Sequence, residues 1–244
     1  MQPTNQLIQW PRAQYWDKAW NPIIGCDPIS PACEHCYALS LIRRFHPNMP
    51  LTPRSTKRTT PPKSKVVFCG NLTDLFGDWI KNGVGCELIR ATMPNRDATY
   101  LWLTKRPLNM GRILSTPMFS ASVLRNHFFG FTAENSDWYN NRDVDYQFTT
   151  PEWVNYWISC EPLLGPINLM LMPQHLPSWV GVGCESGPVR RPCKLEWVRE
   201  IVRECQRYGV PVFVKQLDLD GECVKDIERF PEDLRIRQVP WEVK

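Results

Sequence analysis

Three cysteines near the N-terminus have the types and spacing of metal ligands. Cys26, Cys33 and Cys36 follow the pattern C-x6-C-x2-C on one short segment. Thiolates are soft ligands that favour iron–sulfur clusters or zinc. Three of them on one loop can surround a single metal centre while leaving a fourth position open. The spacing therefore predicts a thiolate-ligated metal centre at these three residues.

Zinc is the main alternative to an iron–sulfur cluster. A structural zinc site is closed by four protein ligands, and the nearest histidines are His35, between two of the cysteines, and His46, ten residues after Cys36. Ligation by His35 together with both neighbouring cysteines would be strained, whereas His46 could reach. The other seven cysteines occur singly, so the spacing favours a cluster and leaves both metals open.

The composition indicates a cytoplasmic globular domain. The chain has 244 residues, which suits one barrel-sized domain, and its net charge is only +4. It opens without the basic start and apolar run of a secretory signal, and no stretch approaches the roughly 18 apolar residues of a membrane span. We therefore predict a cytoplasmic protein with no membrane partner. In that compartment clustered cysteines indicate metal or catalysis rather than disulfides.

Basic residues gather just after the cysteines. The segment 43–65 contains seven basic residues and no acidic one. They are Arg43, Arg44, Arg54, Lys57, Arg58, Lys63 and Lys65. Such a block is typical either of a face that binds the phosphates of a nucleic acid or nucleotide or of a solvated loop.

Short apolar runs recur along the chain and predict buried strands. Six are clear, at Lys65–Cys69, Thr99–Leu103, His127–Phe131, Tyr156–Ser159, Trp179–Val182 and Pro211–Val214, and a seventh lies around Ala19–Ile23. They are continuous rather than alternating, as expected for parallel strands buried on both faces. Helical patterns lie between some of them, at Trp79–Met93 and Leu195–Tyr208. This strand–helix repeat predicts a doubly wound sheet or a βα barrel.

A polar cluster follows each of the six clear strands. The clusters contain Asn71, Asp74, Lys105, Arg106, Glu134, Asn135, Glu161, Glu185, Ser186, Lys215 and Gln216. Parallel βα units place every strand-to-helix turn at the same edge of the sheet. We therefore expect these side chains to line one cavity shared with the cysteine loop, with opposite charges paired across it when no ligand is bound.

Two of these carboxylates are candidates for catalysis. Glu161 and Glu185 follow the fifth and sixth strands, counting the run around Ala19–Ile23 as the first, and either could act as a general acid or base if it is buried. Alternatively, each caps the following helix or pairs with a nearby cation, namely Lys105, Arg106, Lys215 or Arg191.

The cysteine motif and several later blocks together resemble a known protein family. The run WNPIIGCDPISPACEHCYA is similar to the signature of a phage- and prophage-associated, three-cysteine family that is radical S-adenosylmethionine (SAM)-like and of uncharacterised function. Further blocks match the same family in the same order: FCGNLTDLF, LTKRP, GFTAEN, SCEPLLGPI, GCESGP and VPVFVKQ. The resemblance covers about Trp20 to Gln216.

The resemblance implies a fold and a domain organisation. The fold would be α/β, a partial, open βα barrel of the radical-SAM type with about six or seven parallel strands. The barrel would occupy residues 1–217. A C-terminal acidic tail, 218–244, would pack on the barrel or extend from it.

The resemblance also implies a set of cofactors. In that superfamily three cysteines hold a [4Fe–4S] cluster, and the amino and carboxylate groups of SAM fill the fourth iron; here the cysteines would be Cys26, Cys33 and Cys36. The residues implied to contact SAM are Asn71 and Asp74 at its amino group, Lys105 or Arg106 at its carboxylate, and Glu134 and Glu161 at its ribose hydroxyls. The chain departs from the superfamily in a longer first gap and in His35, which stands where an aromatic residue usually precedes the last cysteine.

Two functions follow from these observations. The first is a radical-SAM-like iron–sulfur enzyme that uses a [4Fe–4S] cluster, SAM and a reducing electron donor for radical chemistry on a nucleic acid or nucleotide bound by the segment 43–65. The second is a non-catalytic protein that binds zinc or an iron–sulfur cluster and acts with a partner protein in a phage or defence context. Metal content and SAM binding discriminate between them.

Overall fold

The core of the molecule is a sheet whose parallel strands are arranged in chain order. The computed structural model describes residues 8–45, 47–48, 50–187 and 189–241. Within that part of the chain, the main sheet has eight strands in the order β11-β10-β9-β8-β7-β6-β5-β2. Their bounds are β2 Lys18–Trp20, β5 Val66–Cys69, β6 Thr99–Thr104, β7 His127–Thr132, β8 Tyr156–Cys160, β9 Trp179–Gly183, β10 Val212–Leu219 and β11 Glu222–Val224.

The predicted seven parallel strands are present in this sheet. Each pair from β2–β5 to β9–β10 is parallel, and only the β10–β11 hairpin is antiparallel. The class is therefore α/β with a mostly parallel sheet, as expected. Because β2 and β11 stand at opposite ends of the strand order, the sheet is not closed into a barrel.

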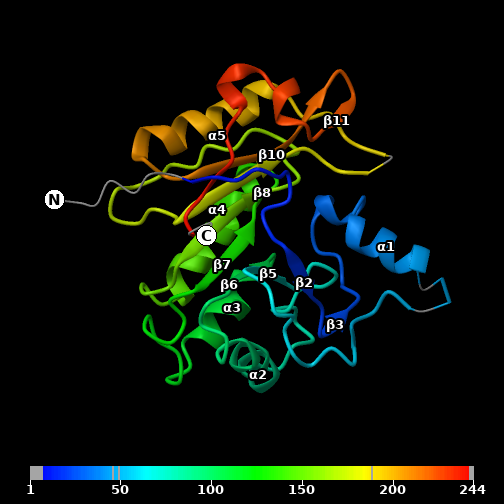
Figure 1. Cartoon of the computed structure of the whole chain (residues 1–244), viewed down its shortest axis with the longest axis vertical. Coiled ribbons are helices and arrows are strands. Elements are labelled where there is room, and N and C mark those ends of the chain that lie inside the picture. The colour runs from blue at the N-terminus through cyan, green and yellow to red at the C-terminus, as the bar shows by residue number, and fades with distance from the viewer. Residues whose placement is uncertain (1–7, 46, 49, 188, 242–244) are drawn as a thin grey trace.

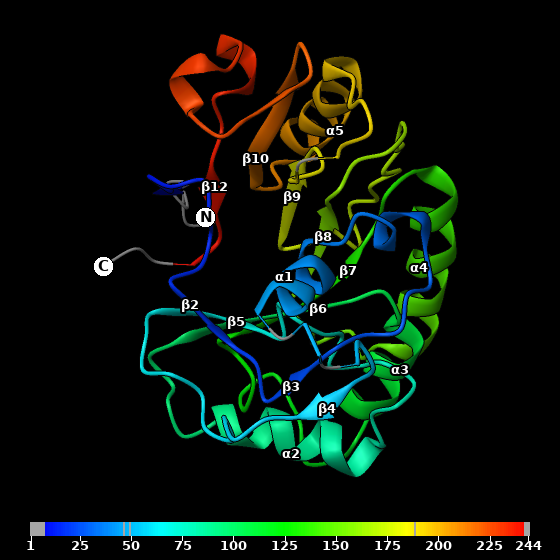
Figure 2. The same cartoon turned by 90° about the vertical axis from the view of Figure 1, so that its right-hand side faces the viewer.

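Helices follow most of the parallel strands and cover one face of the sheet (Figures 1 and 2). They are α2 Asn82–Thr92 after β5, α3 Pro107–Leu114 after β6, α4 Ser136–Thr149 after β7 and α5 Leu195–Tyr208 after β9. The helix predicted to begin at Trp79 starts later, at Asn82, whereas α5 has its predicted bounds. It ends at Gly209, whose left-handed backbone lets its amide bond to the carbonyls of Cys205 and Gln206.

The opposite face of the sheet is packed with aromatic side chains. Trp157, Trp179 and Phe213 point to this face from β8, β9 and β10, and Tyr15 from the N-terminal segment packs among them. The Tyr15 ring centroid lies 4.7 Å from that of Trp179 and 5.3 Å from that of Phe213. Side chains alternate between faces along a strand. Ser159 and Glu161, two and four residues after Trp157, are therefore on the same face as these aromatic side chains, closer to the carboxyl ends of the strands.

The remaining elements are short. They are β1 Ile8–Gln9, β3 Ile23–Ile24, η1 Pro31–Cys33, α1 Tyr37–Phe45, β4 Arg54–Ser55, η2 Ile227–Arg229, η3 Glu232–Leu234 and β12 Gln238–Val239. Strands β1 and β12 pair antiparallel, as do β3 and β4. Among the described residues, no helix combines the length and apolar composition that crossing a bilayer requires.

The segment after residue 217 is part of the same packed body. Strand β10 continues through Leu219, so the predicted boundary between 217 and 218 falls inside a strand. Beyond it, Val224, Phe230 and Leu234 are buried in the core on the helix-covered face. The C-terminal segment therefore extends the sheet and packs on it.

Gly130 in β7 offers a test of this packing. A Cβ at Gly130 would lie 2.6 Å from ring atoms of Trp157, which is fully buried and donates from Nε1 to the Trp102 carbonyl oxygen over 3.1 Å. We expect Gly130→Ala to lower the free energy of unfolding by about 1–3 kcal/mol through overpacking, as measured by urea denaturation. The control is Gly83→Ala in α2, where no atom lies within 4 Å of the new Cβ and about 0.5–1 kcal/mol of stabilisation is expected. Equal effects at the two positions would contradict this account.

Candidate functional site

A cavity opens at the carboxyl ends of the parallel strands. Its volume is about 200 Å³, far more than one water needs, so it can hold a small molecule. The predicted site residues that line it are Cys26, Cys33, Cys36, Asn71, Asp74, Lys105, Arg106, Glu161 and Glu185. Glu134 is fully buried behind this lining and contacts Lys105. The chain order of the parallel strands therefore brings the predicted residues to one place.

The cysteine loop enters this cavity between β3 and α1 and is anchored at both ends. Gly25 has φ of 92° and donates from its amide to the Leu72 carbonyl oxygen. A side chain at Gly25 would collide with the carbonyl of Thr52, so only glycine fits here. At the other end, the Tyr37 hydroxyl donates to the Asn71 carbonyl oxygen over 3.0 Å. These contacts hold the loop across the carboxyl ends of the strands.

The three thiols share the cavity but are not gathered around one point. All three are partly exposed. Among the residues that the structure describes, no group of three or more His, Cys, Asp or Glu side chains is placed to hold a metal ion. His35 Nδ1 lies 3.4 Å from Glu185 Oε2, and His46 lies outside the described residues. A metal centre at this motif therefore requires the loop to draw its thiols together.

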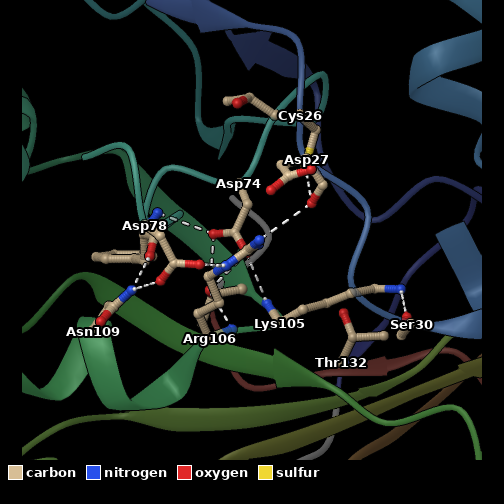
Figure 3. Close-up of polar contacts among 12 residues, drawn as sticks. Cys26, Asp27, Ser30, Asp74, Asp78, Lys105, Arg106, Asn109 and Thr132 are labelled. Atoms are coloured by element: carbon tan, nitrogen blue, oxygen red, sulfur yellow. Dashed lines mark hydrogen bonds and ion pairs between the residues drawn. The ribbon is translucent and has the colours of Figure 1, made fainter. Parts of the chain in front are cut away.

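Lys105 connects the cysteine loop to the sheet (Figure 3). Its Nζ lies 2.6 Å from Ser30 Oγ, the contact drawn in the figure. The same nitrogen lies 3.4 Å from Cys33 Sγ and 2.7 Å from Glu134 Oε1. Burial opposes ionisation of Cys33, but the Lys105 ammonium and hydrogen bonds from the loop outweigh it, so the pKa of Cys33 lies below its ordinary value. At Cys26, by contrast, burial and the nearby Asp74 raise the pKa to about 12. Cys26 and Cys33 are thus electrostatically different.

Glu134 is held between two cations in the protein interior. Besides Lys105, Arg142 of α4 donates from Nη1 to Glu134 Oε2 over 2.6 Å, and Arg142 is itself buried against Trp138. Burial raises the pKa of Glu134, but the two cations and Ser30 lower it more, so it stays below its ordinary value. Sequence reasoning missed Arg142. The signal in the sequence was a basic residue eight positions after Glu134, within the segment that forms α4.

Asp74 and Arg106 are occupied by contacts within the protein (Figure 3). Asp74 accepts hydrogen bonds from the Thr104 hydroxyl at 2.8 and 3.0 Å and from the Lys105 amide at 3.0 Å. Arg106 donates from Nε to Asp78 Oδ2 over 2.8 Å, lies 3.4 Å from Asp74 and reaches the Asp27 carbonyl in the cysteine loop at 3.2 Å. Both residues therefore brace the cavity that they line, and their role as direct SAM contacts stays a prediction.

Two predicted polar residues also have structural partners. The Asn71 Oδ1 accepts a 2.7 Å hydrogen bond from Asn21, a buried residue that sequence reasoning did not single out. Asn135 caps α4, because its Oδ1 accepts from the Trp138 amide at 3.1 Å. Their side chains shape the strand ends.

Glu161 and Lys215 form an ion pair next to the aromatic side chains of the N-terminal segment. Lys215 Nζ lies 2.6 Å from Glu161 Oε2 and about 5 Å from the ring centres of both Tyr15 and Trp16. The Glu161 side chain is 9% exposed, and its Oε1 is buried without a hydrogen-bond partner among the described residues. An unpaired buried carboxylate oxygen is costly, so this atom is suited to receive a donor from a bound molecule.

Glu185 links the cysteine loop to the segment before α5. The Arg191 guanidinium and amide both bond to its carboxylate, with Nε 3.1 Å and the amide nitrogen 2.8 Å from Oε2. Arg191 Nη1 also lies 3.5 Å from Glu34 Oε2. Burial opposes ionisation of Glu185, but its bonds to Arg191 outweigh burial and lower the pKa. An ionised Glu185 can accept a proton but does not hold one to donate.

The expected pairing of opposite charges at the strand ends is thus present. Lys105 pairs with Glu134, Lys215 with Glu161 and Arg191 with Glu185. The two carboxylates predicted as catalytic have the partners that the alternative named. Their participation in proton transfer stays a prediction.

The basic residues of the segment 43–65 lie mostly on the surface, and none of the seven lines the cavity. Arg43 and Arg44 of α1 are exposed, as are Lys57, Arg58, Lys63 and Lys65, while Arg54 is half-buried and donates to the Pro50 carbonyl. Residues 46 and 49 of this segment lie outside the described residues. Tyr37, at the first turn of α1, lines the cavity, whereas Arg43 and Arg44 lie in the last turn of the same helix.

Comparison with known proteins identifies a family. No curated protein and no solved structure matches the chain. A family model described as "protein of unknown function (DUF5131)" matches residues 11–229. That range contains the cysteine loop, the eight strands of the main sheet and every residue of the cavity discussed above. Since the match spans most of the sequence, the chain belongs to the DUF5131 family.

Proposed function

We propose that this protein is a radical-SAM-type iron–sulfur enzyme. Cys26, Cys33 and Cys36 would ligate a [4Fe–4S] cluster, and SAM would occupy the adjoining cavity. One observation carries the proposal: three partly exposed thiols on one loop line the same cavity as the charged strand ends. With SAM bound, the cluster would supply one-electron reductive chemistry at the mouth of the sheet.

The donor set fits a cluster better than a closed zinc site. Three thiols share one loop, and His35, the histidine within that loop, faces Glu185. Three thiolates and no fourth protein ligand suit a cluster with an open iron, whereas structural zinc uses four. Because the thiols are not gathered among the described residues, metal binding would be coupled to ordering of the loop.

The cavity contains groups of both signs suited to a zwitterion such as SAM. The Lys105 ammonium stands beside Cys33 and can meet a carboxylate. The unpartnered Oε1 of Glu161 can accept from an amine or hydroxyl. Asp74 and Arg106, already bonded within the protein, would hold the loop and the β6 end in place. Glu134 would fix the position of Lys105.

The fold supports the same assignment. Parallel strands that follow one another in chain order, with helices over one face, are the arrangement of βα barrels, and an unclosed sheet of this kind corresponds to a partial barrel. The cysteine loop follows the first strand and lies at the carboxyl ends, where ligands of parallel α/β folds bind. The exposed cations of the segment 43–65 would bind a phosphate-bearing substrate, a nucleic acid or nucleotide, and a reducing electron donor would be needed.

A second candidate is a non-catalytic metal protein that acts with a partner protein. It is favoured by the ion pairs of the cavity, since Glu134, Glu161 and Glu185 all have cationic partners within the chain. In this case zinc or a cluster would close the cysteine loop, and the cavity charges would serve only to hold the strand ends together.

Anaerobic reconstitution tests the two candidates. The full-length protein is supplied with iron and sulfide, and iron, sulfide, zinc and visible absorbance are measured, followed by titration with SAM. The enzyme proposal expects about four irons per chain and SAM binding that requires the cluster. Tetrahedral zinc in protein prepared this way would select the metal protein. A full cluster without SAM binding would keep the ligands and reject the enzyme.

A further inference from the structure

Two cysteines outside the metal motif bring their sulfur atoms into contact. Cys184 follows β9 and lines the cavity, and Cys223 lies in β11. Their Sγ atoms are 3.8 Å apart, although 39 residues separate them in sequence. Neither residue has a part in the proposed function.

The backbone holds this sulfur pair in place. The Cys184 amide donates to the Gln216 carbonyl at 3.3 Å, and Gln216 Nε2 returns a 2.7 Å bond to the Cys184 carbonyl. Cys223 stands opposite Asp218 in the antiparallel β10–β11 ladder. Both cysteines are thus tied to β10, one on each side. A disulfide has an S–S distance near 2.05 Å, so the two side chains would have to rotate and the β11 hairpin would have to shift toward Cys184 to close the remaining gap.

We propose that Cys184 and Cys223 form a reversible disulfide, making this pair an oxidative modification site next to the cavity. The oxidant is a low-molecular-weight disulfide, R–S–S–R. The Cys223 thiolate attacks one sulfur, which forms the mixed disulfide Cys223–S–S–R and expels one RS⁻, protonated to RSH. Cys184 then loses its proton and attacks the Cys223 sulfur, expelling the second RS⁻. Two protein thiols are oxidised, and one small disulfide is reduced to two thiols.

The order of the two steps follows from exposure. Cys223 is partly exposed, whereas Cys184 is buried, so an oxidant in solution reaches Cys223 first. Burial raises the pKa of the Cys184 thiol, and the neighbouring Cys223 and Cys193 raise it further, so Cys184 is the less reactive thiol in solution and attacks only when the mixed disulfide at Cys223 stands beside it. Cys193 is also nearby but is buried, and its amide is bonded to Asp218 at 3.0 Å.

The disulfide would tie the β11 hairpin to the cavity lining. The residue after Cys184 is Glu185, which holds Arg191 and faces His35 of the cysteine loop. Oxidation would therefore fix the end of β9, where Glu185 connects the cysteine loop to the segment before α5. The inference does not depend on a metal or on SAM.

Peptide mapping of the full-length protein tests the proposal. The folded protein is incubated with oxidised glutathione, free thiols are alkylated after denaturation, and the protein is cleaved after methionine with cyanogen bromide and then digested with trypsin. Trypsin places Cys223 in the peptide 216–225, Cys193 in 191–194 and the metal-motif cysteines in 19–43; cleavage after Met170 and Met172 separates Cys160, in 143–170, from Cys184, in 173–190. These peptides distinguish every competing pair.

We expect one cross-linked species that joins the peptide of Cys184 to 216–225, and its loss after treatment with dithiothreitol. Cys223→Ser should abolish the cross-link and leave Cys184 alkylatable, whereas the control Cys86→Ser, in α2, should keep it. Wild-type protein in which Cys184 and Cys223 both stay alkylatable, or in which Cys184 is linked to Cys193 instead, would overturn the proposal. These overturning results are measured on wild-type protein alone, so they remain valid even if one of the two variants fails to fold.

Discussion

Glu134→Gln is expected to lower the free energy of unfolding by about 3–5 kcal/mol, the usual cost of removing one partner from a buried ion pair. The Glu134 side chain is 1% exposed and bonds to Arg142 and Lys105. A neutral amide leaves the buried Arg142 guanidinium without a compensating charge. Lys105 is less affected, because 19% of its side chain reaches solvent.

Urea denaturation with matched variants measures this effect. The control is Glu152→Gln, which makes the same chemical change at an exposed position outside the described ion pairs and should shift stability by no more than about 0.5 kcal/mol. Similar shifts for both variants would show that Glu134 contributes only as a surface charge would.

The same carboxylate gives the protein an acid dependence. The pKa of Glu134 in the folded protein lies below the ordinary value of 4.5, and Glu185 is shifted in the same direction. A lowered folded pKa contributes stability that is present above pH 4.5 and is lost as the pH falls through the folded pKa, because the unfolded chain then binds more protons. Between pH 6 and pH 3 the free energy of unfolding should therefore decrease less steeply with falling pH in Glu134→Gln than in the wild type. Equal slopes of the free energy of unfolding against pH in the two proteins would contradict this linkage.

The arrangement of the strands could be predicted because it depends on local patterns. Continuous apolar runs such as Val66–Cys69 and Tyr156–Cys160 indicate strands buried on both faces, and helices between them force parallel pairing. Once parallel pairing is given, the polar residues that follow each strand must share one edge. For this reason Lys105, Glu161 and Glu185 could be placed in one cavity without coordinates.

The partners of those residues could not be predicted in the same way. Lys105 was a candidate ligand contact in the sequence, but the structure bonds it to Ser30, 75 residues earlier, and to Glu134, 29 residues later. Asp74 likewise accepts hydrogen bonds from the Thr104 side chain and the Lys105 backbone. Such pairings depend on side-chain rotamers and on how far each loop folds back over the sheet, and neither property leaves a periodic signal in a single sequence.

The N-terminal aromatic residues show the same limit of local patterns. Tyr15 is almost fully buried among Trp157, Trp179 and Phe213, yet it belongs to no helix or strand. Its burial results from the inner face of an open sheet, which must be covered by some other part of the chain. The sequence contains the aromatic residues but no periodicity that assigns them to this face.

Replacement of any one of Cys26, Cys33 and Cys36 by Ala is expected to abolish a full [4Fe–4S] cluster in protein reconstituted without oxygen. Each variant has two thiols left in the loop, and the histidine of that loop is engaged with Glu185, so the loop itself offers no third ligand in place of the lost thiolate. Iron, sulfide and visible absorbance measure the loss. All three thiols are partly exposed, so their truncation should cost little folding stability, and thermal unfolding of the metal-free variants should resemble that of the metal-free wild type.

The matched control is Cys223→Ala. Cys223 is also partly exposed, but it lies in β11, away from the metal motif, and its variant should keep the full complement of iron and sulfide. Retention of a complete cluster by any one of the three loop variants would remove that cysteine from the ligand set. Loss of iron in the Cys223 variant as well would show that metal uptake follows the general thiol content of the protein, because a specific three-cysteine centre predicts a sharp difference between the loop and β11.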